Sequence, residues 1–211
     1  MVQDIAIIGA GGFGREVKHL IDEINSVHNT WNLLGFYDTI VPRGTIVNGA
    51  EVLGDNKDAI NSNCENFVLA IGSPNVLAKL SEIFLLHQKK FPNLAHPLMS
   101  ISDYQFSNVG IGNIFSYGFH MTTNIKICDF NIFNTRITLG HDVEIGSFNV
   151  FLPNVQISGN VCIKNKNLFG MNSSVLQGKE IGSKNKIGAH SFVATNIESE
   201  QSVFGIPAVN I

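Results

Sequence analysis

The residue pair in this chain best suited to proton transfer is a histidine followed at once by an aspartate, His141 and Asp142. Histidine changes charge near neutral pH, so its imidazole can take a proton from a nucleophile as a general base. A neighbouring carboxylate can orient the ring and stabilise the imidazolium, as in hydrolase triads. Because consecutive residues on a strand point to opposite faces, we expect the two side chains to meet only at a turn. The alternative is an exposed turn with no catalytic role.

A second candidate site is rich in glycine. Gly9, Gly11 and Gly14 follow an apolar segment and open an amphipathic one. Such a turn lets backbone N–H groups and a helix N-terminus approach a phosphate closely. Asp38 follows the next apolar segment, where a carboxylate can accept a hydrogen bond from a ribose hydroxyl. The same glycines are also compatible with a tight turn that binds nothing.

The elements expected around these glycines alternate between strand and helix. Apolar runs predict strands over 4–9, 33–38 and 67–72, and amphipathic patterns predict helices over 12–24 and 74–87. Strands that alternate with helices favour a parallel sheet covered on both faces. We therefore expect an α/β, Rossmann-like domain over residues 1–95, about half the size of a full dinucleotide-binding fold.

The second half of the chain has a different period. From residue 109 onward every sixth position is apolar, fifteen times without exception: Val109, Phe115, Met121, Ile127, Phe133, Leu139, Ile145, Phe151, Ile157, Ile163, Phe169, Val175, Ile181, Ile187 and Val193. With 44% hydrophobic residues in the chain, chance would produce this about once in a few hundred thousand trials for a given phase.

A period of six predicts an all-β solenoid over residues 96–211, in which each hexad supplies a short strand and a turn. Three hexads would close one triangular coil, and the sixth-position side chains would stack in a central column. Glycines directly after the apolar position, at 146, 182 and 188, are expected to form tight corners with unusual dihedral angles. An antiparallel sandwich, the alternative, would show period two instead.

The remaining histidines, cysteines and charged residues argue against a metal site, a disulfide-rich protein and a nucleic-acid partner. His120, His141 and His190 are not separated by multiples of the eighteen-residue coil, so we expect no triad of histidine ligands for a metal. Three scattered cysteines favour a reducing compartment, and we expect a cytoplasmic protein. A net charge of -3 disfavours nucleic acid as a partner. Between Gly159 and His190, however, five lysines stand against one acidic residue, and this excess suits a polyanion or simply a solvated surface.

The whole chain resembles the hexapeptide-repeat acyltransferases with a left-handed β-helix, in particular the bacterial sugar acetyltransferases of the sialic-acid O-acetyltransferase and bacillosamine or perosamine N-acetyltransferase type. The matching segments run in order along the chain: GAGGFG at 9–14, GFYD at 35–38, LAIG at 69–72, NLAHP at 93–97, NT at 134–135, GHD at 140–142, SGN at 158–160 and GIPA at 205–208.

This resemblance implies a homotrimer and transfer of an acetyl group from acetyl-CoA to the amino group of a nucleotide-linked deoxyamino sugar. His141 and Asp142 would be the base and its acidic partner. The nucleotide sugar would contact Gly9, Gly11, Gly12, Gly14, Asp38, Gly72 and Asn134. Coenzyme A would lie in a cleft between neighbouring β-helices, against Gly159, Met171, Ala189 and Val150, the last standing where some relatives have a histidine.

Two alternatives stay open. One is O-acetylation of a sialic acid or another sugar, and the other is a non-catalytic scaffold that binds nucleotide sugars. His96, before a proline, is expected to be structural. Val209 stands where the closing motif of the resembled family usually has a basic residue.

Overall fold

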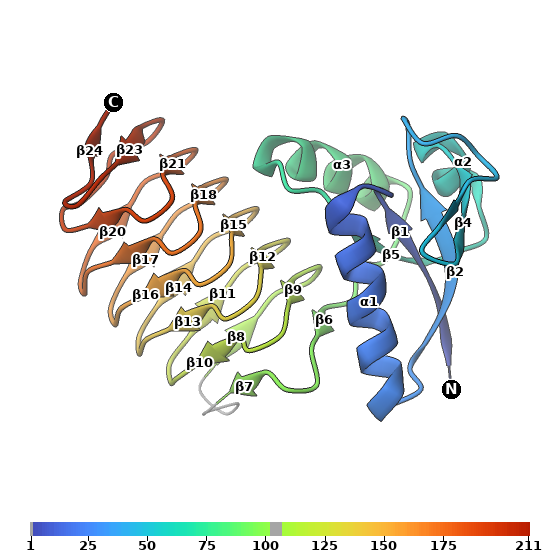
Figure 1. Ribbon diagram of the computed structural model, residues 1–211, viewed down its shortest axis with the longest axis horizontal. Helices are drawn as coiled ribbons and strands as arrows, with labels where there is room; N and C mark the ends of the chain where they lie inside the picture. Colours follow the sequence, from blue (N-terminus) through green and yellow to red (C-terminus); the bar gives the residue numbers. More distant parts are fainter. Residues whose placement is uncertain (1, 102–106) are drawn as a thin grey trace.

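The computed structural model describes residues 2–101 and 107–211, which form an α/β domain and a parallel β-helix lying side by side (Figure 1). The domain contains β1 (Gln3–Ile8), α1 (Gly12–Val27), β2 (Trp31–Tyr37), β3 (Ile46–Val47), β4 (Ala50–Gly54), α2 (Asn56–Asn61), β5 (Asn66–Leu69) and α3 (Pro74–Leu86). Its sheet has the order β3-β4-β2-β1-β5, with β1 parallel to both β2 and β5. The strands and helices predicted in this half are therefore confirmed.

The segment between β2 and β5 was not predicted from the sequence. It folds as the hairpin of β3 and β4 followed by the short helix α2. A capping box starts α2: an Asp55 side-chain oxygen accepts hydrogen bonds from the backbone N–H of Lys57 and Asp58, and the Asp58 carboxylate accepts from the N–H of Asp55. This reciprocal pattern satisfies amides that a helix of two turns would otherwise leave free.

The β-helix consists of short strands, all of two residues except β23 (Ser202–Phe204), and each inner strand of a sheet is paired in parallel with the strands one coil earlier and one coil later. At the C-terminal end, β24 (Val209–Asn210) pairs antiparallel with β23. The first sheet contains β6 (Leu94–Ala95), β9 (Ile114–Phe115), β12 (Ile132–Phe133), β15 (Val150–Phe151), β18 (Leu168–Phe169), β21 (Lys186–Ile187), β23 and β24. The second contains β7 (Ser100–Ile101), β10 (His120–Met121), β13 (Thr138–Leu139), β16 (Gln156–Ile157), β19 (Ser174–Val175) and β22 (Phe192–Val193). The third contains β8 (Asn108–Val109), β11 (Lys126–Ile127), β14 (Glu144–Ile145), β17 (Cys162–Ile163) and β20 (Glu180–Ile181).

Each coil thus passes from the first sheet to the second and the third. We call the turn between the first and second sheets the first corner, that between the second and third the second corner, and the return to the first sheet the third corner. From β8 to β22 strand partners are eighteen residues apart, for example Phe133 and Phe151, whereas the pairs of β6 with β9 and of β7 with β10 are twenty apart and that of β21 with β23 is sixteen apart. This is the coil length that the sequence predicts.

The sixth-position residues form the predicted column. All are buried except Val109, which is half-buried. Along the first sheet, Phe115, Phe133, Phe151 and Phe169 stack face to face with ring centroids 4.7–5.2 Å apart. Because the strands pair in parallel and in register, equivalent residues of successive coils lie above one another. The apolar side chains at every sixth position therefore stack into one continuous core.

The corner geometry differs from the prediction. The left-handed backbone conformation falls on the third residue after the apolar position, as at Asn124 (φ 58°), Asp142 (φ 58°) and Asn160 (φ 55°). Gly146 is not among the residues with positive φ. It is small for another reason: a methyl group there would lie 2.8 Å from the Lys164 carbonyl oxygen of the next coil. Glycine is therefore required by the close approach of two coils, not by an unusual dihedral angle.

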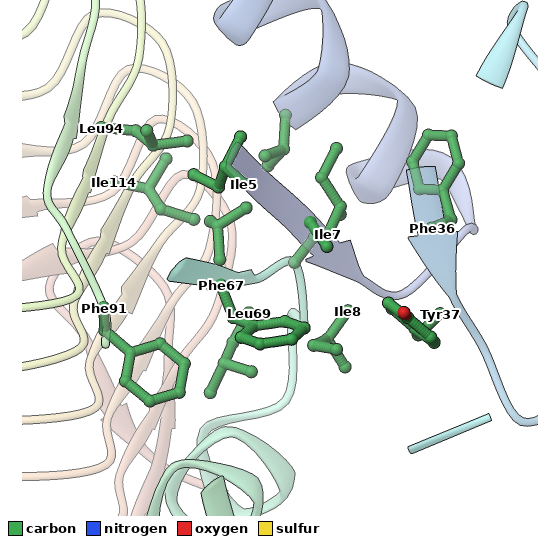
Figure 2. Packing of buried hydrophobic residues seen from close by; sticks show 14 of the residues in the cluster. Ile5, Ile7, Ile8, Phe36, Tyr37, Phe67, Leu69, Phe91, Leu94 and Ile114 are labelled. Atoms are coloured by element: carbon green, nitrogen blue, oxygen red, sulfur yellow. The ribbon is translucent and has the colours of Figure 1, made fainter. Parts of the chain in front are cut away.

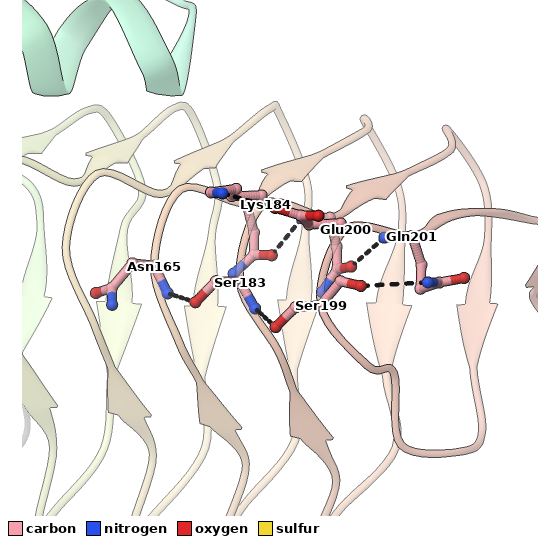
Figure 3. Close-up of polar contacts among 8 residues, drawn as sticks. Asn165, Ser183, Lys184, Ser199, Glu200 and Gln201 are labelled. Atoms are coloured by element: carbon pink, nitrogen blue, oxygen red, sulfur yellow. Dashed lines mark hydrogen bonds and ion pairs between the residues drawn. The ribbon is translucent and has the colours of Figure 1, made fainter.

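A ladder of buried asparagines crosses the third corner, at 113, 131, 149, 167 and 185. The Oδ1 of Asn149 accepts from the backbone N–H of Asn167 at 2.9 Å, and the same bond recurs from coil to coil. Beside it, serine hydroxyls satisfy backbone amides in a second column, in which Ser199 accepts from the N–H of Ser183 and Ser183 from that of Asn165 (Figure 3). Backbone N–H groups at this corner that have no strand partner are hydrogen-bonded in this way, the buried ones by the asparagines and the exposed ones by the serines.

The two halves share one core. Ile114, Ile132 and Val150, on the outer surface of the first sheet, are buried with Phe91, Leu94 and the apolar residues of β1 and β5 (Figure 2). Strand β6 already pairs with β9, so residues 94 and 95 lie in the β-helix. Within the described residues, no helix is both long and apolar enough to cross a membrane.

Candidate active site

His141 and Asp142 lie at the second corner, between β13 and β14. Because Asp142 adopts the left-handed conformation, the chain turns there and the two side chains can meet although they are neighbours in sequence. The Nδ1 atom of His141 stands 2.7 Å from the Oδ2 atom of Asp142. The expectation that the pair meets at a turn is thus met by the structure.

The carboxylate of Asp142 is held on both sides. Its Oδ1 atom accepts a hydrogen bond of 2.9 Å from Nδ2 of Asn124, the matching residue one coil earlier. The hydrogen bond with His141, and then that from Asn124, lower the pKa of Asp142 below its ordinary value. An ionised acceptor at Nδ1 favours the tautomer that carries its hydrogen there, which leaves Nε2 of His141 free to accept a proton.

Gly159 lies directly beneath the imidazole, one coil after His141. A methyl group at Gly159 would stand 2.6 Å from Cε1 and 2.8 Å from Cδ2 of His141, so the ring rests against the glycine backbone. The side chains of His141 and Asp142 keep 52% and 49% of their surface exposed. The pair is therefore fixed by its neighbours and still accessible to a substrate.

The glycine-rich turn lies at the carboxyl end of β1, between the ends of β2 and β5. The structure explains two of its glycines by packing: Gly9 has φ 103°, and a side chain on Gly14 would collide with the carbonyl group of Gly9. Gly11 and Gly72 have open space around them, and Gly12 has only the tip of Arg15 nearby. The fold therefore leaves room for a ligand at the N-terminus of α1, where free amides attract anions.

Asp38 fastens this turn. Its carboxylate accepts hydrogen bonds from the backbone N–H groups of Ala10 (2.7 Å), Ile40 (2.7 Å) and Val41 (2.9 Å). Burial by itself would raise the pKa of Asp38, but these hydrogen bonds outweigh burial and lower it. Asp38 thus lies beside the glycines, and its observed partners are the loop's own amides.

A groove of about 720 Å³ separates α1 from the first corner of the β-helix. Gly12 and Arg15 line the α1 side, and Asn134, Thr135 and Tyr117 line the β-helix side. Ligand sites commonly have this size and lie between domains. The groove joins Asn134 to the glycine-rich turn, but His141 is one corner away on the same chain. Apart from Gly12, Asn134 and Thr135, the groove residues, Arg15 and Tyr117 among them, had no sequence signal, because only the packing of α1 on the coils brings them together.

The predicted coenzyme contacts fall at separate places. Gly159 belongs to the second corner, whereas Met171 and Ala189 follow β18 and β21 at the first corner, one coil apart. Val150 is buried against the α/β domain. The five lysines also spread out: Lys164, Lys166 and Lys184 at the third corner, Lys179 before β20 and Lys186 on β21. They form no single patch beside His141.

The other histidines occupy unrelated positions. His120 lies on the outer surface of the second sheet, and His190 contacts Asn172 at the first corner, 3.2 Å from Nε2 to Nδ2. His96 follows β6 in the first coil and is buried, with its Nε2 3.1 Å from Oε2 of Glu23 on α1. In residues 2–101 and 107–211, no three histidine, cysteine, aspartate or glutamate side chains lie close enough together to hold a metal ion.

Comparisons with known proteins agree with this architecture. Residues 4–84 match the PglD N-terminal domain family. A comparison with curated sequences finds no match. Among solved structures, the acetyltransferase domain of PglB from Neisseria gonorrhoeae, in complex with acetyl coenzyme A, is 25% identical with a TM-score of 0.89 and full coverage of both chains. WeeI from Acinetobacter baumannii gives the same three values.

A variant of perosamine N-acetyltransferase from Caulobacter crescentus, in complex with CoA and GDP-perosamine, is 23% identical with a TM-score of 0.89 over 100% of this chain and 98% of that one. Together these matches confirm the predicted resemblance and the fold class, a Rossmann-like domain followed by a left-handed parallel β-helix. They also confirm the predicted class of enzyme, an acyltransferase.

Proposed function

We propose that this acyltransferase moves the acetyl group of acetyl-CoA to the amino group of a nucleotide-linked deoxyamino sugar, with His141 as the general base. The observation that carries the proposal is the pair at the second corner, where the Asp142 carboxylate lies 2.7 Å from Nδ1 of His141 and so favours the tautomer in which Nε2 can accept a proton. The PglB domain with acetyl coenzyme A and the perosamine enzyme with CoA and GDP-perosamine support the choice of substrates.

In this mechanism the neutral amine attacks the thioester carbonyl carbon directly. A C–N bond forms, the C–S bond breaks, and the coenzyme leaves as its thiol. Nε2 of His141 takes the proton that the amine loses and can return it to the departing sulfur. Asp142 stabilises the imidazolium while it exists, as a carboxylate does in a triad. In this proposal no covalent acyl-enzyme forms, because the amine of the sugar is itself the nucleophile.

For the nucleotide sugar, we place the diphosphate at the N-terminus of α1, beside Gly11, Gly12 and Gly72. These positions have the space that Gly9 and Gly14 lack. Asn134 would contact the sugar from the opposite wall of the groove. Asp38 would act mainly by fixing the turn, because its oxygens already accept three backbone hydrogen bonds.

Acetyl-CoA would bind between two copies of the chain. Gly159 and the pair of Met171 and Ala189 belong to different corners of one β-helix, so a single cleft lined by all three requires a second copy. A homotrimer around a threefold axis would supply three such clefts. Val150, buried in the core between the domains, has no part in this proposal. Free thiols at Cys64, Cys128 and Cys162 suit a reducing cytoplasm. Light scattering is expected to give three times the chain mass, and a monomer at micromolar concentration would contradict this cleft.

The test of the mechanism is His141→Ala, assayed by thiol release with a set of nucleotide-linked amino sugars. Loss of the base should lower kcat by about 10²-fold to 10⁴-fold with ligand affinities unchanged. Asp142→Asn should cost less, because the imidazole remains. Near-normal kcat in His141→Ala at saturating substrates would overturn the role of His141. A product whose acetyl group is released by mild alkali would be an ester and would support O-acetylation instead.

A further inference from the structure

The end of the groove farther from the glycine-rich turn contains a carboxylate flanked by two histidines. One face of α1 lines the groove from Gly12 to Glu23, a distance of about 16 Å at 1.5 Å per residue. Glu23 stands at that end together with His19 of the same helix and Tyr117, which follows β9 in the second coil. Behind them lies His96, 4% exposed, with its ring edge-to-face against Tyr117 at 5.2 Å between centroids.

His96 has a fixed tautomer. Its Nδ1 atom accepts a hydrogen bond of 2.9 Å from the backbone N–H of Leu98, so the ring hydrogen of the neutral form must be on Nε2. Nε2 is buried and makes no aligned hydrogen bond within the described residues. Its nearest acceptor is Oε2 of Glu23, at 3.1 Å. The only donor of the buried ring therefore lies 3.1 Å from the carboxylate in the groove, without an aligned hydrogen bond to it.

Each oxygen of the Glu23 carboxylate thus faces an imidazole. Oε2 faces His96 at 3.1 Å, and Oε1 faces Nε2 of His19 at 3.5 Å. The side chain of Glu23 is still 38% exposed. A carboxylate carries about four acceptor positions and no donor when ionised, so lone pairs remain for a ligand. The two histidines limit how the carboxylate can turn, which makes its remaining acceptor positions directional.

We propose that Glu23 is a specificity-determining residue of the groove, that it accepts a hydrogen bond from a hydroxyl or ring N–H of the nucleotide sugar, and that His96 is its positioning residue. This inference rests on the proposed function. Like charges repel, so a diphosphate is favoured at the opposite end, where the N-terminus of α1 attracts anions. The amine that reacts has to reach His141, which lies at another corner, so Glu23 contacts a different donor of the same ligand.

The competing explanation is that His96 and Glu23 only fasten α1 to the first coil. A fastening of this kind would change the melting temperature but would leave the affinity for a nucleotide sugar unchanged in a folded protein. A contact with the ligand changes that affinity and spares acetyl-CoA. The two explanations therefore predict different results in binding measurements.

The experiment is calorimetric titration of the full chain and its variants with GDP-perosamine, with a UDP-linked amino sugar, with GDP and UDP alone, and with acetyl-CoA. Glu23→Gln should weaken nucleotide-sugar binding by about 10-fold to 100-fold, the usual value of a hydrogen bond to a charged group. Acetyl-CoA binding should not change. The control is Glu82→Gln, which removes an exposed carboxylate from α3 outside the groove and should bind all probes like the wild type. If GDP or UDP alone shows the loss, the donor is on the nucleoside, and otherwise it is on the sugar.

The second variant tests the positioning role. His96→Asn keeps an acceptor near Leu98 but has no group that reaches Glu23, so KM for the nucleotide sugar should rise while kcat at saturation holds. His96→Gln, whose amide can reach the place of Nε2, should restore most of the lost affinity. In a Glu23→Gln background, His96→Asn should add little. Equal nucleotide-sugar affinity in wild type and Glu23→Gln would overturn the inference alone. A wild type that binds acetyl-CoA but no nucleotide sugar would overturn the proposed function and this inference with it.

Discussion

Replacing Gly159 by alanine should disable the catalytic pair without unfolding the β-helix. The added methyl group would stand 2.6 Å from Cε1 and 2.8 Å from Cδ2 of His141. Carbon atoms that are not bonded rest about 3.5–4.0 Å apart, so the imidazole has to retreat by about 1 Å. The backbone of Gly159 is outside the left-handed region, so alanine itself causes no backbone strain there.

The expected loss of activity follows from that displacement. A shift of about 1 Å moves Nε2 away from the reacting amine and stretches the 2.7 Å contact between Nδ1 and Asp142. Misplacement by about 1 Å can cost 10²-fold in rate, so we expect kcat to fall about 10-fold to 100-fold, or about 1.4–2.7 kcal/mol in the barrier. Because the ring is half exposed and can move into solvent, stability should change by less than about 0.5 kcal/mol.

The assay is steady-state thiol release at saturating acetyl-CoA and sugar, with thermal unfolding measured on the same samples. Gln177→Ala is the matched control, because Gln177 occupies the same corner position one coil later and is exposed. If Gly159→Ala keeps the kcat of the wild type, the imidazole is not used in the position seen here. A fall in acetyl-CoA affinity with unchanged kcat would assign Gly159 to the coenzyme alone.

Three other substitutions test separate parts of the structure. Gly11 has open space around it and a φ of -73°, so Gly11→Val should fold normally. Calorimetry should show unchanged acetyl-CoA binding and a loss of nucleotide-sugar affinity. Equal loss of both ligands would refute the separation of the two sites. Asp38→Asn should destabilise the protein by about 2 kcal/mol at pH 7. The pKa of Asp38 is lowered by folding. The stabilisation by its carboxylate is therefore present above the unfolded pKa and disappears as pH falls through the folded pKa. If urea titrations give the same difference in unfolding free energy between wild type and Asp38→Asn at pH 7 and at acid pH, this reasoning is wrong. Asn149→Ala should lower the free energy of unfolding by about 2–4 kcal/mol in chemical denaturation, because the buried N–H of Asn167 loses its acceptor. A decrease below about 0.5 kcal/mol would mean that the asparagine ladder adds nothing to stability.

The sequence by itself determined the β-helix. An apolar residue at every sixth position allows one arrangement in which all of them are buried, and the column from Phe115 to Val193 has the predicted members. It also determined β1, α1, β2, β5 and α3, because buried strands and amphipathic helices have distinct local periods. The hairpin of β3 and β4 has only seven strand residues between them, too few to show a period.

Other features depend on contacts between residues one coil apart. The sequence predicted small residues at the corners, yet Gly146 is small because Lys164 of the next coil approaches it, and not because of its own dihedral angles. Asn149 could be a surface residue in any local reading, and only stacking on Asn131 and Asn167 makes it a buried acceptor. A single hexad contains no information about its neighbour eighteen residues away.

The candidate site divides in the same way. The sequence identified His141, Asp142 and the glycine-rich turn, since proton transfer and phosphate binding need those residue types. Only the tertiary structure decided that Asp142 turns back to meet His141, that Gly159 lies under the ring, and that Asn134 faces α1 across a groove. The physical reason is that these distances are set by how coils stack and how α1 packs against them, and side chains far apart in the chain carry no local signal of that packing.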